Sequence, residues 1–342
     1  MFRLLSIISL AFSLHAAEPL RVCATIPDLG DLVRAVGGEE VAVTVFARGS
    51  DDPHFVDPSP GFAKALARAD LVVSVGLVLE MSWLSVVVTQ SRNPRLAVGR
   101  PGWFESSSAI RPLGVVERPV DDGHGHAHGR AGGDVHSAGN PHFLSDPVCG
   151  VQVAKALAVR LGQLAPERAA IFLAQQRAFA LLVAKRLLGE ALVARAGETA
   201  VVSALERDDL AGVIGDGADL AGWLGLLKPV QGSPVVADHD LWPYFSRRFG
   251  LTVAAFLEPK PGIPASTRHL AKVVELMRAR GVRAILTVPY ADPRHATFVS
   301  QQTGLPVVML AHQAGSLPDA SSWLETVDRN VRVLAQALVT GK

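Results

Sequence analysis

The stretch PERAAIFLAQQRAFALLVAKRLLGEALVAR, residues 166–195, has the pattern of one long helix. It is rich in Ala, Leu, Gln and Arg, which favour helix, and Pro166 suits a first turn. A helix from Glu167 to Arg195 would be roughly 45 Å long at 1.5 Å per residue. The whole segment 146–196 lacks strand signals, so we expect a rigid helical connector between two other units.

Short apolar runs alternate with helical patterns on both sides of this connector. The N-terminal side predicts strands at 21–27, 41–47, 71–75 and 95–98 and helices at 29–36, 61–69 and 80–89. The C-terminal side predicts strands at 235–237, 253–257, 284–288 and 307–310 and helices at 220–227, 241–249, 266–280, 294–302 and 322–339. This alternation indicates an α/β fold of two lobes with mainly parallel sheets, at 18–145 and 197–342. Ligand sites in such folds lie on loops at the carboxyl ends of strands.

The first 17 residues predict a secretory signal peptide. Arg3 supplies the charged end, residues 4–14 form a short apolar run, and Ala16 and Ala17 provide small residues for cleavage. No later segment offers about 18 uninterrupted apolar residues. We therefore expect an exported, soluble mature protein.

The overall composition argues against several classes of protein. The 342 residues include 33 Lys+Arg and 32 Asp+Glu, so no field that would attract nucleic acid or a membrane surface is expected. The only cysteines are Cys23 and Cys149, and no CxxC pair occurs, which argues against a cysteine zinc site. The two could form a disulfide or remain separate buried thiols.

Histidine is concentrated in one segment, DDGHGHAHGRAGGDVHSAGNPHF, at residues 121–143. Glycine, aspartate and histidine dominate it, so it cannot form a packed core, and a His-rich tract is typical of metal binding. A flexible surface loop without a ligand is the alternative. The predicted loop, 121–136, contains His124, His126, His128 and His136.

Three further histidines stand where strands or helices are expected to meet loops. They are His54 in DDPHFVDPSP, His142 in GNPHFLSDP and His239 in VVADHDLWPYF. Pro53 and Pro141 restrict the backbone before the first two, which aims each imidazole at little ordering cost. Imidazole suits Zn, Cu, Fe and Ni better than Mg, Ca or Mn. Candidates for carboxylates that orient the rings are Asp57, Asp146, Asp238 and Asp240.

These motifs resemble those of the cluster A-I solute-binding proteins of metal ABC transporters. DPHFVDPSP is similar to their Asp-Pro-His-x-(Tyr/Phe)-x-Pro-(Thr/Ser)-Pro motif, and NPHFLSDP is similar to their second motif. HDLWPYFSRRFGL, FLEPKPGIPAS and QQTGLPVVML resemble later segments. The likeness covers nearly the whole mature chain in order, and its motifs are specific as a set.

The resemblance implies two α/β lobes joined by a long rigid helix, with a metal in the cleft between them. His54, His142 and His239 would bind it, and the His-rich loop and a histidine at 239 are similar to the zinc branch of the family. Relatives often place an aspartate after the strand that here ends at Leu310. This chain has Ala311 and then His312, so His312 or a water is expected as fourth ligand. Segment 197–217 looks like an insertion.

The function that the resemblance implies is an exported, periplasmic, high-affinity Zn²⁺ receptor. It would deliver zinc to an inner-membrane ABC permease with its ATPase, as a monomer and without catalysis. The alternatives are a manganese or iron receptor of the same family, or a secreted three-histidine zinc hydrolase with Glu258 as its base.

Overall fold

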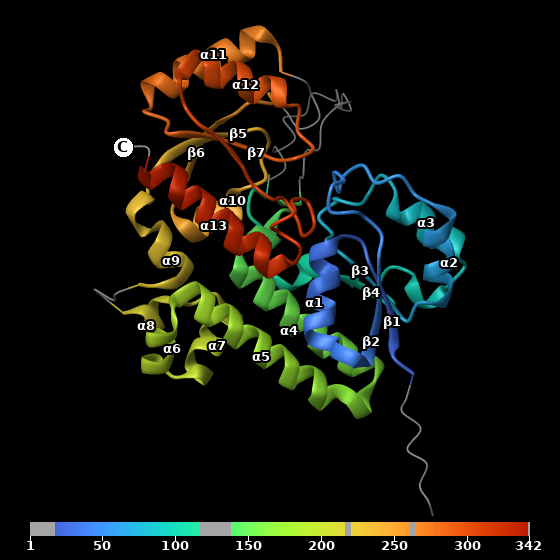
Figure 1. The fold of residues 1–342 in the computed structure, drawn as a ribbon. Helices are drawn as coiled ribbons and strands as arrows, with labels where there is room; N and C mark the ends of the chain where they lie inside the picture. The colour runs from blue at the N-terminus through green and yellow to red at the C-terminus, as the bar shows by residue number, and fades with distance from the viewer. Residues whose placement is uncertain (1–17, 116–137, 216–219, 260–264, 341–342) are drawn as a thin grey trace, which may run out of the picture.

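The computed structural model describes residues 18–115, 138–215, 220–259 and 265–340 (Figure 1). The predicted signal peptide, 1–17, and the His-rich loop, 121–136, lie outside the described residues. Within them, two four-stranded parallel sheets lie in two lobes. The predicted α/β class is confirmed.

The N-terminal lobe is built on a parallel sheet with the strand order β2-β1-β3-β4. Its strands are β1 (Leu20–Ala24), β2 (Val41–Val45), β3 (Leu71–Ser74) and β4 (Trp103–Glu105). Its helices are α1 (Pro27–Gly37), α2 (Pro60–Arg68) and α3 (Leu84–Ser91). Every residue of β3 is buried, as expected for a parallel sheet covered on both faces.

The C-terminal lobe repeats this arrangement with the order β6-β5-β7-β8. Its strands are β5 (Pro234–Ala237), β6 (Thr252–Phe256), β7 (Ala284–Thr287) and β8 (Val307–Met309). Its helices are α10 (Pro243–Phe249), α11 (Thr267–Ala279), α12 (Pro293–Thr303) and α13 (Trp323–Thr340). The shared strand order places the loops after β1 and β5 at equivalent positions, where open α/β sheets bind ligands.

The predicted strand at 95–98 is wrong. A short 3₁₀ turn, Pro94–Leu96, occupies this segment. The Asn93 side chain accepts the backbone N–H of Arg95 at 3.2 Å, so that N–H cannot join a strand ladder. The fourth strand is β4, which pairs in parallel with β3.

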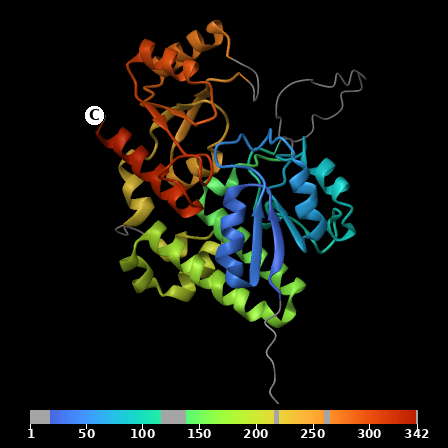
Figure 2. The same ribbon diagram turned by 45° about the vertical axis from the view of Figure 1, so that its right-hand side comes forward.

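The helical connector consists of α4 (Pro147–Leu164), α5 (Ala169–Leu188) and α6 (Glu190–Ala196). The single helix predicted for 167–195 is therefore interrupted, at Gly189. This residue has a φ of 89°, and a Cβ there would lie 2.6 Å from the Cβ of Ala221, so only glycine fits. The long helix α5 remains, about 30 Å in length, and runs beneath both lobes (Figures 1 and 2).

The described residues of segment 197–231, which includes the proposed insertion at 197–217, are mainly helical. They form α7 (Glu198–Arg207), α8 (Ala211–Ile214) and α9 (Gly222–Leu227). Helix α7 packs on α4 and α5, and α9 packs on α5 and α13. The segment therefore thickens the helical layer rather than the C-terminal sheet.

The closing helix α13 ties the two lobes together. It starts beside α1 of the N-terminal lobe and runs into the C-terminal lobe (Figures 1 and 2). At its start, the backbone N–H of Trp323 donates to Asp31 at 2.8 Å. The Trp323 indole N–H donates to the Leu144 carbonyl at 2.9 Å.

The described helices include none that is long and apolar enough to cross a membrane. Cys23 and Cys149 are both buried and free, so the structure shows two separate thiols rather than a disulfide.

Candidate metal centre

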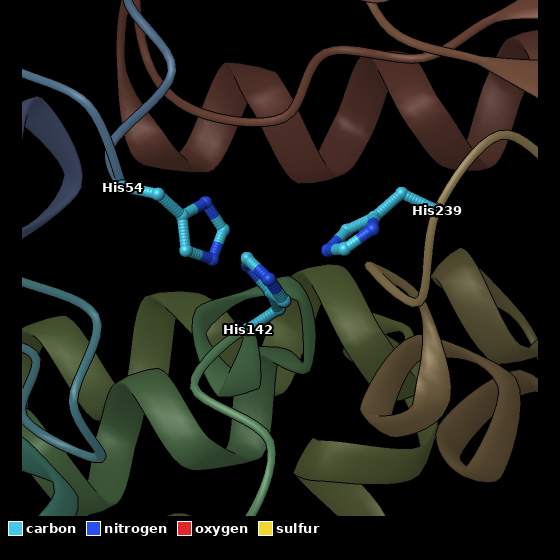
Figure 3. A group of neighbouring side chains, drawn as sticks. All are labelled: His54, His142 and His239. Carbon is cyan, nitrogen blue, oxygen red and sulfur yellow. The ribbon is translucent and has the colours of Figure 1, made fainter. Parts of the chain in front are cut away.

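Three histidines from separate parts of the chain meet between the lobes (Figure 3). His54, His142 and His239 each offer one ring nitrogen, and these nitrogens lie within 4.8 Å of one another. The ring centroids are 5.2 Å apart for His54 and His142 and 5.9 Å apart for each pair with His239. A tetrahedral zinc site has nitrogens about 3.4 Å apart, from Zn–N distances of about 2.0–2.1 Å. Small side-chain rotations would bring all three nitrogens to one ion.

His54 lies on the loop that follows β2, and one carboxylate fixes its ring. Asp52 Oδ1 accepts the backbone N–H of His54 at 3.0 Å and lies 2.8 Å from its Nδ1. A carboxylate can only accept, so Nδ1 carries the proton and Nε2 presents a lone pair. Burial raises the pKa of Asp52, but the hydrogen bonds from the ring and backbone of His54 help to outweigh this effect and hold that pKa below its usual range.

His142 precedes α4 and is fixed by the same kind of turn. Asn140 Oδ1 accepts the backbone N–H of His142 at 2.9 Å, just as Asp52 does for His54. The Asn140 amide donates to the Asp240 carbonyl at 2.7 Å and lies 3.2 Å from its carboxylate. Tyr244 donates to the Asn140 carbonyl at 2.9 Å. The loop of His142 is thereby tied to the loop of His239.

His239 follows the carboxyl end of β5, the predicted place for a ligand. It is 9% exposed, and its Nδ1 lies 3.3 Å from Glu258, which follows β6. This carboxylate favours a proton on Nδ1 and leaves Nε2 to face the other two histidines. Glu258 therefore orients a ring rather than standing free as a base.

The structure does not bring His312 into the three-histidine group. Its Nε2 lies 3.1 Å from the Asp51 carbonyl, and its ring stacks edge-on against Tyr290, with centroids 4.7 Å apart. Burial lowers the pKa of His312 to about 4. His312 is thus neutral at pH 7 and carries its proton on Nε2.

Three of the four carboxylates proposed from sequence as ring-orienting partners have other roles. Asp57 is exposed, and Asp238 bonds the Thr287 hydroxyl. Asp146 caps α4 and pairs with Arg247 and Arg248. Only Asp240 contacts a histidine loop, through Asn140.

The orienting residues that sequence reasoning missed are Asp52 and Asn140. The signal was present in the chain: each stands two residues before a histidine, in Asp-Pro-His and Asn-Pro-His. Asp and Asn side chains commonly accept the backbone N–H two residues on.

Two parallel-sheet lobes with a histidine cluster between them define a class, the two-lobed receptors that bind metal ions. The chain belongs to the ZnuA family, whose model is described as "Zinc-uptake complex component A periplasmic" and matches residues 22–185 and 225–337. The predicted membership of the metal-binding solute receptors is confirmed. The unmatched residues between the two ranges, 186–224, include the whole of the proposed insertion at 197–217.

Curated relatives carry the same family name. The chain is 25% identical over 312 residues to the high-affinity zinc uptake system protein ZnuA of Yersinia pestis, covering 86% of this chain and 85% of that one. It is 23% identical over 190 residues to the ZnuA of Brucella abortus, covering 56% of this chain and 47% of that one. The match thus spans about half the length of the Brucella protein.

Several solved structures are similar in fold to this chain. A crystal structure of ZnuA has a TM-score of 0.68 and 19% identity, with 94% of this chain and all of that chain covered. The laminin-binding protein Lmb of Streptococcus agalactiae, described as an adhesin with metal-transporting activity, has a TM-score of 0.66 and 20% identity, with 93% and 99% covered. At these identities the likeness shows the fold alone.

Proposed function

We propose that this chain is an exported receptor that binds one Zn²⁺ between its lobes and delivers it to an inner-membrane ABC permease with its ATPase. The observation that carries the proposal is the convergence of His54, His142 and His239 within 4.8 Å. Two of these rings have Nδ1 beside a carboxylate, which is the usual support of a zinc-binding histidine. Binding, rather than catalysis, is the proposed work of the site.

The donor set favours zinc over manganese. Three neutral imidazoles suit Zn²⁺, whereas Mn²⁺ prefers carboxylate and carbonyl oxygen. A ZnuA deletion mutant of similar fold was solved with zinc bound, while a periplasmic metal-binding protein of Candidatus Liberibacter asiaticus was solved with manganese. The nature of the ligands, rather than the fold, therefore supports zinc here.

We propose that a water molecule is the fourth ligand of the zinc ion and that His312 does not coordinate it. The Nε2 of His312 is committed to the Asp51 carbonyl, and using the ring as a ligand would require that bond to break or the ring to approach through Nδ1. The His312→Ala variant should leave the visible spectrum of bound Co²⁺ unchanged in shape. A changed spectrum with weaker binding would restore His312 as a ligand.

Proposed roles for the segments outside the described residues rest on composition. Residues 1–17 would direct export, with cleavage near Ala16 and Ala17, so the receptor would work in the periplasm as a monomer. The His-rich loop, 121–136, would collect zinc weakly and pass it to the tight site.

We also propose a role for the three larger units of the chain. They would hold the metal site open to the permease: the lobes at 18–145 and 197–342 and the connector at 146–196.

Metal content tests the proposal directly. Protein purified without added metal should contain close to one zinc per chain after dialysis, and Mn²⁺ should not displace it in competition titrations. In a zinc-starved host that lacks the receptor, the parent should restore growth and the His239→Ala variant should not. Retention of manganese instead of zinc, or full growth with His239→Ala, would overturn the proposal.

A further inference from the structure

The segment after β8 forms a clasp between the lobes, beside the pocket that His142 lines. We use "clasp" for residues 311–316 of the C-terminal lobe together with the loop 48–52 and Asp28 of the N-terminal lobe. The backbone N–H of Ala314 donates to Asp28 at 2.7 Å. His312 contacts the Asp51 carbonyl at 3.1 Å. These contacts join the end of one sheet to the loop that leads to His54.

Gln313 is the centre of the clasp. Its side-chain amide donates to three backbone carbonyls of the N-terminal loop: Arg48 at 2.9 Å, Asp51 at 3.0 Å and Gly49 at 3.2 Å. The residue is 1% exposed. Three carbonyls that converge on one NH₂ group can only accept hydrogen bonds from it, so the orientation of the amide is fixed by its surroundings.

The backbones also touch within the clasp. A Cβ on Gly49 would lie 2.1 Å from the carbonyl carbon of Gly315. No side chain fits between these two chain segments, which come from different lobes. The close approach and the Gln313 hydrogen bonds therefore fix how far apart the lobes stand at this edge.

The clasp connects directly to a ring that faces the metal site. The carbonyl of Asp51 accepts from both His312 and Gln313, and the next residue, Asp52, holds both the backbone and the ring of His54. His54 belongs to the N-terminal lobe, whereas His239 and Gln313 belong to the C-terminal lobe. Loss of the clasp would let His54 move relative to His239.

We propose that Gln313 is a positioning residue for zinc: it sets the distance between His54 and His239 and thereby the affinity and residence time of the ion. The inference rests on the proposed three-histidine zinc site, but it concerns a residue outside the three proposed ligands. Its amide acts through the loop 48–52. Loss of a residue that helps to orient a metal ligand typically weakens metal affinity by about 10- to 100-fold.

The test compares two isosteric substitutions in the full mature chain. Gln313→Glu replaces the donating NH₂ by an oxygen that faces three carbonyl oxygens. The control, Gln176→Glu, removes another buried amide, which donates to Glu206 at 3.2 Å, between α5 and α7. Gln313→Met removes the donor without adding a charge and serves if the glutamate variant fails to fold.

For each variant, zinc affinity is measured by competition with a chromophoric chelator, zinc release by stopped flow, and stability of the metal-free protein by urea unfolding. We expect Gln313→Glu and Gln313→Met to weaken zinc binding by about tenfold or more, mainly through faster release. Bound Co²⁺ should show an altered visible spectrum, because the nitrogens would no longer hold their geometry. Gln176→Glu should lower stability and leave affinity within about twofold.

Parent-like affinity and an unchanged Co²⁺ spectrum in folded Gln313→Met would overturn the positioning role. Equal losses of affinity in Gln313→Met and Gln176→Glu would also overturn it, because stability alone would then explain both. The zinc proposal itself fails differently: the parent would show no tight zinc binding, or His239→Ala would bind as the parent does.

Discussion

Asp52 Oδ1 forms two hydrogen bonds with His54, one with its backbone N–H at 3.0 Å and one with its ring Nδ1 at 2.8 Å. A single carboxylate oxygen thus fixes both the turn that presents the imidazole and the ring nitrogen that carries the proton. Because Nδ1 is protonated, Nε2 is the nitrogen left for a metal. This residue therefore prepares the site before any ion arrives.

The Asp52→Asn variant should bind zinc about 10- to 100-fold more weakly than the parent. The amide can still accept the backbone N–H, but it no longer supplies the charge that strengthens the ring as a ligand. Chelator competition measures the change. Asp57→Asn is the matched control, because this carboxylate is exposed on the same loop. Equal affinity in the two variants would show that Asp52 does not support the site.

A second prediction concerns the base of the site. Asp146 is fully buried, caps α4 and pairs with Arg248 at 2.8 Å and Arg247 at 3.1 Å. Asp146→Ala would remove the buried carboxylate that Arg247 and Arg248 share and leave both arginines with Asp208 alone. We expect a loss of about 3 kcal/mol, the lower end of the range for breaking a buried ion pair. Urea unfolding should show this loss, and the control Asp57→Ala should show little. A loss below about 1 kcal/mol, the range of exposed pairs, would contradict the argument.

The buried carboxyl of Asp28 makes a prediction about pH. Burial raises its pKa from 3.8 to about 7, so the folded protein holds this proton more tightly than the unfolded chain does. The contribution of Asp28 to the free energy of unfolding is complete below pH 3.8 and is lost as the pH rises through about 7.

Asp28→Asn keeps an oxygen for the Ala314 N–H and removes the titration. Relative to the parent, the variant should gain stability between pH 5 and pH 8 in urea unfolding experiments. His312 acts in the opposite direction. Folding lowers its pKa from 6.5 to about 4, so its contribution to the free energy of unfolding is lost as the pH falls. Comparing the variant with the parent cancels the His312 contribution. An identical pH profile for the two proteins would contradict the prediction.

Much of this fold could be predicted from sequence, because apolar periodicity is a local property. All strands except β4 were placed, with small errors at their ends, since continuous runs such as LVVS and AILT mark buried parallel strands. The interruption at Gly189 was not foreseen. It depends on the close approach of Ala221, a contact between distant segments that no local pattern records.

The three histidines of the site could also be predicted from the sequence. Each of the three histidines stood in a recognisable turn, and the structure brings all three together. Their assignment as zinc ligands remains a prediction. The position of His312 could not be foreseen, because it depends on the Asp51 carbonyl, 261 residues away in the chain. The same holds for Glu258, which reaches His239 only because β5 and β6 are neighbours.

The His-rich loop gives a prediction that separates capture from tight binding. Replacing residues 121–135 by a Gly-Ser segment of equal length should reduce the number of weakly bound zinc ions and slow uptake. The tight site should keep its affinity, because none of its three histidines is removed. Calorimetry resolves the two classes of site. Loss of the tight class in the replacement variant would contradict an accessory role.

The central claim is that one zinc ion is held by His54, His142 and His239 between the lobes. Anomalous diffraction at the zinc edge, on crystals of the zinc-loaded protein, tests this most directly. The account predicts one dominant peak at about 2.0–2.1 Å from a ring nitrogen of each histidine. A dominant peak elsewhere, or a peak that one of the three histidines does not contact, would contradict it.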